Sequence, residues 1–212
     1  MIARSRFVLP VLLAVAAAAA VAADAERVVN IAMEDQFKNR HETLRYRGDV
    51  VVLVYAERKG AEAALEVGRR LHVRFHPSAA QAPATEWSRQ PVAAPTGWPA
   101  ALAPPDVHVI PVACLPEVPK ALEPVARSRF RKESQFVSVW LDFADTMRQR
   151  FGGVPDEPNV VLLDTRGCPQ GVVSGHLDEV RFGEVAAAID QLRLQSLQDR
   201  TAAIPAAAPV VR

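Results

Sequence analysis

Residues 50–55 read Val-Val-Val-Leu-Val-Tyr, an apolar run with no polar alternation. A strand with one face in water alternates apolar and polar side chains, whereas a strand buried on both faces does not. The run therefore predicts a central strand of a sheet covered on both sides. Half of the 212 residues are apolar, which is enough to build such a core.

Helix and strand patterns alternate around this run. Apolar residues at helical spacing predict a helix over 61–74, and the stretch VHVIPVA predicts a second buried strand over 107–113. The other predicted elements are strands at 28–32, 137–141, 160–163 and from 172, helices at 119–132, 145–151 and ending at 192, and a polar loop at 34–47. The helical crossover predicts that 50–55 and 107–113 pair in parallel, and the short connection between the last two strands predicts antiparallel pairing.

Residues 77–105 interrupt this order with seven prolines in 29 residues. Proline removes a backbone donor and disfavours the interior of helices and sheets, so the segment is predicted to be an inserted extended loop. Trp87 and Trp98 within it are expected to pin the loop to the surface by apolar contact. A ligand platform is the alternative role for these two side chains.

The first 25 residues show the pattern of a secretory signal peptide. Arg4 and Arg6 precede an apolar stretch, and small residues between positions 20 and 25 offer cleavage sites. The folded part is therefore expected outside the cytoplasm, in the periplasm or the extracellular space. A retained membrane anchor is the alternative, but the alanine-rich stretch is short and weakly apolar for a spanning helix. Residues 26–200 are predicted to form one domain, and residues 201–212 a flexible tail.

Composition excludes several classes of function. The formal net charge is +1, whereas nucleic-acid-binding domains are normally strongly basic. Two cysteines are too few for a disulfide-rich scaffold or a four-cysteine zinc site. No cofactor-binding fingerprint and no Ser-His-Asp pattern is evident, so we expect no cofactor, no metal and no nucleic acid.

Three stretches near the carboxyl terminus resemble a known family. Residues 150–154 read RFGGV, residues 158–167 read PNVVLLDTRG and residues 174–178 read SGHLD. In this order they resemble the "YGV" helix, the "PTTFLID-x-x-G" strand and the "x-G-x-L-D" helix entry of thioredoxin-like proteins, in the exported thiol-disulfide reductase and peroxiredoxin-like (redoxin) branch. The resemblance covers residues 34–192. It implies an α/β fold with a central mixed sheet flanked by helices, and it places Pro158 at the family's cis-proline position.

The redox motif of that family is absent. Its pattern "F-W-A-x-W-C-G-P-C" aligns with residues 54–62, which read VYAERKGAE, so that Lys59 and Glu62 take the two cysteine positions. Family chemistry needs a thiolate stabilised by the helix N-terminus and a second cysteine to resolve the mixed disulfide. The resemblance therefore implies that the standard dithiol and peroxidase reactions are lost.

The two cysteines of the chain lie elsewhere. Cys114 follows the second parallel strand and is expected at the sheet edge that carries the family's active site. Cys168 lies in a turn and is expected to be exposed, at the opposite end of a strand about 17–20 Å long. A disulfide needs Cα atoms within about 7 Å, so a bridge between the two is not expected. Cys114 is either a half-buried structural residue, the favoured interpretation, or a single-thiol redox centre.

Two other groups of side chains have weaker functional interpretations. His72 and His76 share one helix face and could bind a metal with His108, but no third ligand is in register, and His76 is expected at an exposed helix end. Arg127, Arg129, Arg131 and Lys132 cluster at a helix C-terminus. We favour solvation and interaction with the helix dipole over an anion-binding patch.

Three functions follow as hypotheses. The favoured one is an exported binding or accessory module that uses the groove around Lys59, Cys114 and Pro158 for an extended peptide or another envelope protein. The second is a single-cysteine thiol oxidoreductase or peroxidase-like enzyme built on Cys114. The third is a structural envelope protein, in contact with the membrane only if the N-terminal segment is uncleaved.

Overall fold

The computed structural model describes residues 27–202. The predicted signal peptide at 1–25 lies outside the described residues, as do residues 203–212 of the tail predicted for 201–212. The elements in chain order are β1 (Ala32–Asp35), β2 (Arg40–Glu42), η1 (Thr43–Tyr46), β3 (Val50–Ala56), α2 (Ala61–Phe75), η2 (Pro77–Ala80), η3 (Trp87–Arg89), β4 (Val107–Cys114), η4 (Lys120–Leu122), α3 (Glu123–Glu133), β5 (Trp140–Asp142), α4 (Thr146–Phe151), β6 (Asn159–Leu163), β7 (Pro169–Ser174) and α5 (Glu179–Ala202).

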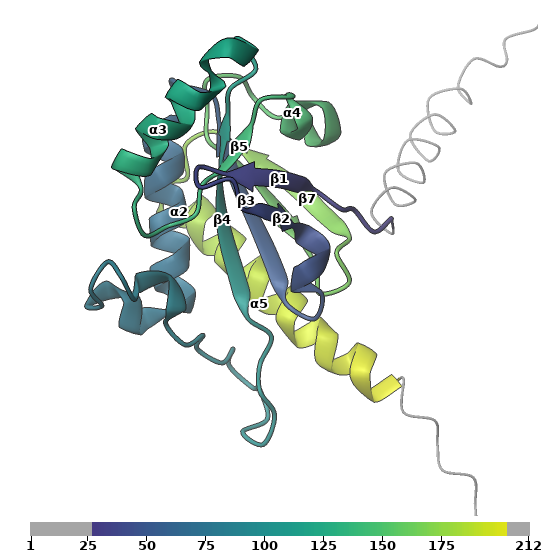
Figure 1. The fold of residues 1–212 in the computed structure, drawn as a ribbon. Coiled ribbons are helices and arrows are strands. Elements are labelled where there is room, and N and C mark those ends of the chain that lie inside the picture. The colour runs from purple at the N-terminus through teal and green to yellow at the C-terminus, as the bar shows by residue number, and fades with distance from the viewer. Residues whose placement is uncertain (1–26, 203–212) are drawn as a thin grey trace, which may run out of the picture.

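The strands form one mixed sheet in the order β2-β1-β5-β4-β3-β6-β7. Strands β3 and β4 pair in parallel, whereas β6 runs antiparallel to both β3 and β7, so both predicted pairings are confirmed. The carboxyl ends of β3 and β4, at Ala56 and Cys114, therefore meet at one end of the sheet. We call this end the upper pole; Figure 1 shows it beside α3 and α4. The opposite end, at Val50 and Val107, is the lower pole.

The central run is buried on both faces, as predicted. Val50, Val52 and Val54 belong to a core cluster that includes buried side chains of α2 and α5. The intervening side chains of β3 belong to a second cluster with Trp140 and Met147 on the other face. Alternate residues of one strand thus enter two separate cores, which explains why the sequence shows no polar alternation.

The first part of the described chain differs from the prediction. The strand begins at Ala32, not at residue 28, and the expected polar loop at 34–47 contains β2 and a 3-10 turn. Strand β1 pairs with β2 on one side and with β5 on the other. Strand β2 lies at the edge of the sheet, where polar side chains face solvent, so its sequence does not show the apolar pattern of a strand.

The Pro-rich segment 77–105, which we call the strap, is an insertion between α2 and β4, as predicted. It lies at the lower pole in Figure 1 and contains the short 3-10 turns η2 and η3. Trp98 is buried, and the ring of Trp87 lies 3.9 Å from that of His72 between centroids. Both tryptophans therefore contribute to apolar anchoring of the strap.

Helix α5 is longer than its apolar stripe predicts. The stripe ends at Leu192, but the helix continues to Ala202. Beyond the stripe, the buried side chains of the helix are the polar ones of Arg193 and Ser196. Arg193 is 1% exposed and donates hydrogen bonds to the carbonyl oxygens of Pro105 (3.0 Å) and Ala93 (2.7 Å). The helix thus holds the strap through a buried guanidinium group, which hydrophobic periodicity does not reveal.

Within residues 27–202, no helix has the length and apolar character needed to cross a membrane.

Candidate functional site

The start of α2 at the upper pole is the place where the resemblance predicts redox chemistry. Lys59 and Glu62 take the two cysteine positions, and both side chains are exposed. Lys59 Nζ lies 2.6 Å from Asp156 Oδ2, and this hydrogen bond raises the pKa of the lysine. Glu62 lies in the first turn, where a carboxylate interacts favourably with the helix dipole. The site therefore presents an ion pair and a carboxylate, and no sulfur.

A loop covers this helix terminus. Residues 152–157, all exposed, connect α4 to β6, and we call them the 152–157 loop. Gly60 touches this loop so closely that a Cβ atom at that position would lie 2.8 Å from the carbonyl carbon of Glu157 and 2.9 Å from the Asp156 oxygen. Any side chain at position 60 would therefore displace the loop backbone.

Asn159 and Tyr55 hold the loop from below. The Asn159 side chain accepts from Val154 N (2.8 Å) and donates to Val154 O (3.1 Å) and Glu157 O (2.9 Å). The Tyr55 hydroxyl donates to Gly152 O at 2.9 Å. Neither residue was predicted from the sequence, because each lies within an ordinary strand pattern. Tyr55 contacts a segment that is distant in sequence, and Asn159 contacts a loop that folds back onto it.

Pro158 follows the loop and is buried. The described chain contains no cis peptide bond, so Glu157–Pro158 is trans, contrary to what the family position implies. The chain turns instead through left-handed backbone at Gly152 (φ 72°), Gly153 (φ 104°) and Asp156 (φ 63°). The adjacent glycines are a turn signal that is visible in the sequence.

Cys114 lies at the end of β4 behind the loop and is 4% exposed. It lines a cavity of about 10 Å³, room for roughly one water molecule. The other lining residues are Tyr55, Glu57, Asp145, Arg148, Gly152, Gly153, Val154, Pro155 and Asn159. Burial, followed by the carboxylates of Asp142 and Asp145, raises the pKa of the thiol to about 12. A reactive cysteine has the opposite environment, exposed and electropositive.

Asp145 is the unusual polar group of this cavity. It precedes α4 in a left-handed conformation (φ 58°) and pairs through Oδ2 with Arg148 at 2.6 Å. Its other oxygen, Oδ1, is buried without a hydrogen-bond partner among the described residues. The cap of this helix is provided by Asp142, whose carboxylate accepts from the backbone N–H groups of Thr146 and Met147.

Cys168 is buried, and the expectation that it is exposed is wrong. Its amide donates to Asp164 Oδ1 at 2.8 Å, and the turn lies under the start of the described chain, where Val29 N donates to Gly167 O. The two cysteines lie at opposite poles and form no disulfide, as predicted. The long-range contact with Val29 explains why a turn sequence is buried here.

The histidines do not gather into a metal site. His76 is buried, contrary to the expected exposed helix end, because its ring stacks on that of His72 at 4.3 Å and Asp106 Oδ1 lies 2.9 Å from its Nε2. His108 pairs separately with Asp49 at 3.0 Å. Among residues 27–202 no group of three or more His, Cys, Asp or Glu side chains is placed to hold a metal ion.

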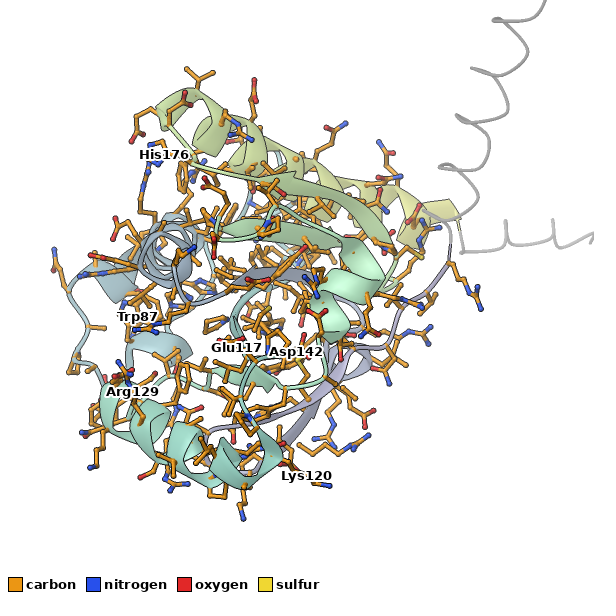
Figure 2. All side chains as sticks on the ribbon, turned by 90° about the horizontal axis from the view of Figure 1, so that it is seen from above. Trp87, Glu117, Lys120, Arg129, Asp142 and His176 are labelled. Carbon is orange, nitrogen blue, oxygen red and sulfur yellow. The ribbon has the colours of Figure 1, made fainter. Side chains whose placement is uncertain are left out.

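The basic cluster on α3 is mostly engaged in structure. Arg127 is buried, pairs with Glu34 at 2.9 Å and donates to Asp35 O, which fastens α3 to β1. Arg129 pairs with Glu133 within the helix, and Arg131 donates to Gln36 O. Seen from above in Figure 2, Arg129 and Lys120 lie on one side of the upper pole, with Glu117 and Asp142 nearer its centre and His176 on the opposite side.

Comparison with solved structures shows which known folds this architecture resembles. The chain is similar to a protein of Neisseria meningitidis described as a thioredoxin, with 14% identity and a TM-score of 0.52 over 84% of this chain and 97% of that one. It is also similar to the exposed thioredoxin lipoprotein of Streptococcus pneumoniae, with 12% identity and a TM-score of 0.50 over 76% of this chain and 99% of that one. No family model and no curated protein matches the sequence.

These similarities and the sheet order define the class of the protein: it has the α/β thioredoxin-like fold expected from the sequence. Within that fold it has no Cys-x-x-Cys pair, because its two cysteines are Cys114 and Cys168.

Proposed function

We propose that this protein is an exported thioredoxin-fold protein without dithiol chemistry, which acts as a binding or accessory module through its upper pole. The partner is an extended polypeptide segment or another envelope protein. The surface for this contact consists of Lys59, Asp156 and the backbone around Pro158.

One observation carries the proposal: the helix start that holds the thiolate in redox-active relatives presents Lys59 and Glu62. The remaining thiol at this pole, Cys114, is 4% exposed with its pKa raised to about 12. A thiolate is the attacking species in disulfide exchange, and a thiol with this pKa is almost entirely protonated at neutral pH. The single-cysteine enzyme is therefore disfavoured against the binding module.

Export is proposed from the pattern of residues 1–25. The similar structure from Streptococcus pneumoniae is that of an exposed lipoprotein, which is compatible with an exported role for this fold. Intact mass and N-terminal sequencing of the protein from the envelope fraction test it. Cleavage between residues 20 and 26 supports a released protein, and an uncleaved chain in the membrane fraction supports the tethered structural alternative.

The redox part of the proposal is tested by alkylation of the purified protein across a pH series, read for each cysteine by mass spectrometry. We expect slow modification of Cys114 with no plateau near the free-cysteine pKa of about 8.5. The protein should also fail to reduce insulin disulfides. Rapid labelling of Cys114 well below pH 8.5 would overturn the proposal in favour of the single-cysteine enzyme.

The binding part is tested with reduced, carboxymethylated lactalbumin as a permanently extended probe. Lys59→Glu reverses the charge at the proposed surface and places two carboxylates together, and we expect binding to weaken roughly tenfold. Lys120→Glu is the matched control, since Lys120 is also an exposed lysine of the upper pole but lies on η4. Equal affinities for both variants, or no binding by the unaltered protein, would contradict the proposed surface.

A further inference from the structure

The 152–157 loop carries Asp156 of the proposed surface and covers the parts of it at Gly60 and Pro158, which are buried. Its backbone rests on the first turn of α2 at Gly60, and four of its residues, Gly152 to Pro155, line the cavity that contains Cys114. The loop therefore forms one wall of this cavity, which is partly open to solvent. Asp145, whose Oδ1 is buried without a hydrogen-bond partner in the described chain, lines the same cavity.

The loop contributes no buried side chain of its own. All six residues are exposed. The side chains of Tyr55, Lys59 and Asn159 hydrogen-bond to the loop, and Gly152 N donates to Arg148 O at its α4 end. The Lys59–Asp156 contact is an exposed ion pair, with the lysine side chain 77% exposed, and such pairs contribute little. A segment with few buried contacts opens at lower free energy than the body of a domain.

The two ends of the loop also favour rigid movement. Gly152 and Gly153 adopt left-handed conformations next to the end of α4, and Pro158 is buried at the start of β6. Gly153 cannot carry a side chain in the closed position, because a Cβ atom would lie 2.6 Å from Asn159 Oδ1 and 2.7 Å from the Tyr55 hydroxyl. Gly153 thus makes the closest contact between the loop and the body of the domain, and the pair Gly152–Gly153 is the position at which the loop can turn.

We propose that residues 152–157 form a lid, which occupies the upper pole in the free protein and swings outward on Gly152 and Gly153 when an extended partner segment binds. This inference rests on the proposed function, because the lid regulates access to that binding surface. Opening removes the loop from Gly60 and uncovers the α2 terminus, Pro158 and the Cys114 cavity together. Partner binding and exposure of Cys114 are therefore linked.

The two buried cysteines allow a direct test, because Cys114 lies under the lid and Cys168 lies at the opposite pole. Iodoacetamide labelling of the full folded protein at pH 8.5 is followed for each cysteine, in water and in low urea. We expect Cys114 to react faster than Cys168, at a rate nearly independent of urea, since lid opening exposes little surface. Cys168 should react only through global unfolding.

Gly60→Ala opens the lid by steric conflict with the Asp156–Glu157 backbone, and its own φ of −83° is compatible with alanine. We expect Cys114 in this variant to be labelled roughly tenfold faster, at a rate that stays nearly independent of urea, whereas Cys168 keeps the steep urea dependence of global unfolding. Gly68→Ala is the matched control on the same helix, where the nearest atom would lie 4.0 Å from the new Cβ. Tyr55→Phe, which removes one hydrogen bond to the loop, is the second variant if Gly60→Ala does not fold.

Equal labelling rates and equal urea dependence at Cys114 and Cys168, in the unaltered protein and in the variants, would overturn the lid. The carboxymethylated probe separates this inference from the proposed function. Faster Cys114 labelling in Gly60→Ala without any probe binding retains the lid and rejects the binding surface. Probe binding that leaves Cys114 protected in every variant retains the surface and rejects the lid.

Discussion

The two poles of the sheet are each crossed by a connection, and the two connections are held in opposite ways. At the lower pole, buried side chains of α2 and α5 hold the strap: His72 donates to Trp87 O at 2.9 Å, and Arg193 donates to two strap carbonyls. At the upper pole, the 152–157 loop is held by one hydroxyl, one amide and an exposed ion pair. Buried side chains of the core hold the strap, whereas the 152–157 loop lies on the surface of the core.

This difference shows that length and composition do not decide which loop is firmly held. The strap is the longer and richer in proline, yet its carbonyl groups accept from buried donors, which makes it costly to detach. The 152–157 loop is short but leaves all of its side chains in solvent. We expect substitutions at the lower pole to change global stability, and substitutions at the upper pole to change local opening.

The largest effect is expected from Arg193→Ala. Removal of this guanidinium leaves Pro105 O and Ala93 O without their donors in a buried region, at a cost of about 2–4 kcal/mol in the free energy of unfolding. Urea denaturation followed by circular dichroism measures it. Arg69→Ala, at an exposed position of α2, is the control. A loss no greater than that of Arg69→Ala would show that the strap is not anchored here.

The second effect is a dependence on pH. Burial, the largest cause, lowers the pKa of His72 below its ordinary value, so the folded protein favours the neutral ring. The unfolded chain then binds the proton more readily, and stability is lost as pH falls through the ordinary histidine pKa of about 6.5, at up to about 1.4 kcal/mol per pH unit.

His72→Gln keeps a donor for Trp87 O and should flatten this part of the stability profile, measured by urea unfolding between pH 5 and 8. His176→Gln, at an exposed position near the upper pole, should leave the profile unchanged. An unchanged slope in His72→Gln would assign the pH dependence to another group.

A third and smaller effect compares glycines on the helices. A Cβ atom added at Gly68 or Gly183 would meet no close neighbour, so Gly68→Ala and Gly183→Ala should each stabilise by about 0.5–1 kcal/mol through helix propensity. Gly60→Ala should lower stability instead, since its Cβ meets the loop backbone. Thermal unfolding of the three variants ranks them. Stabilisation by Gly60→Ala would indicate that the loop yields without cost.

The smallest effect is expected from Lys59→Ala. Both partners of its ion pair with Asp156 are substantially exposed, so the melting temperature should stay within experimental error of the unaltered protein, at low and at high salt. A clear drop in melting temperature that salt abolishes would mean that the upper pole contributes to global stability, and the contrast between the poles would then fail.

Sequence patterns predicted the architecture well because it depends on local periodicity. The run at 50–55, the helical spacing over 61–74 and the short connection before β7 were enough to predict strand pairing. They did not predict β2, a polar edge strand of three residues, or the extension of α5, whose buried face is completed by Arg193. Edge strands and buried charges have no periodic signal.

The site was predicted only in part. The alignment placed Lys59 and Glu62 at the upper pole and the predicted parallel pairing placed Cys114 there, where the structure also has them. It could not predict that Asn159 reaches back to Val154 and Glu157, or that His76 and Cys168 are buried. In each case the burial comes from a segment distant in sequence or from a loop conformation, neither of which the local pattern contains.

The parallel pairing of β3 with β4 has a consequence for how the chain folds. Residue 50 lies opposite residue 107, so the centre of the sheet cannot form until α2 and the whole strap have been placed between the two strands. Closing so long a loop costs chain entropy before any ladder contact compensates for it, and such non-local pairing slows folding. A chain that is synthesised from its amino terminus onward therefore cannot form the β3–β4 ladder until Cys114, the last residue of β4, is available. That delay suits a polypeptide which, on the proposed route of export, must be threaded through a membrane before it folds.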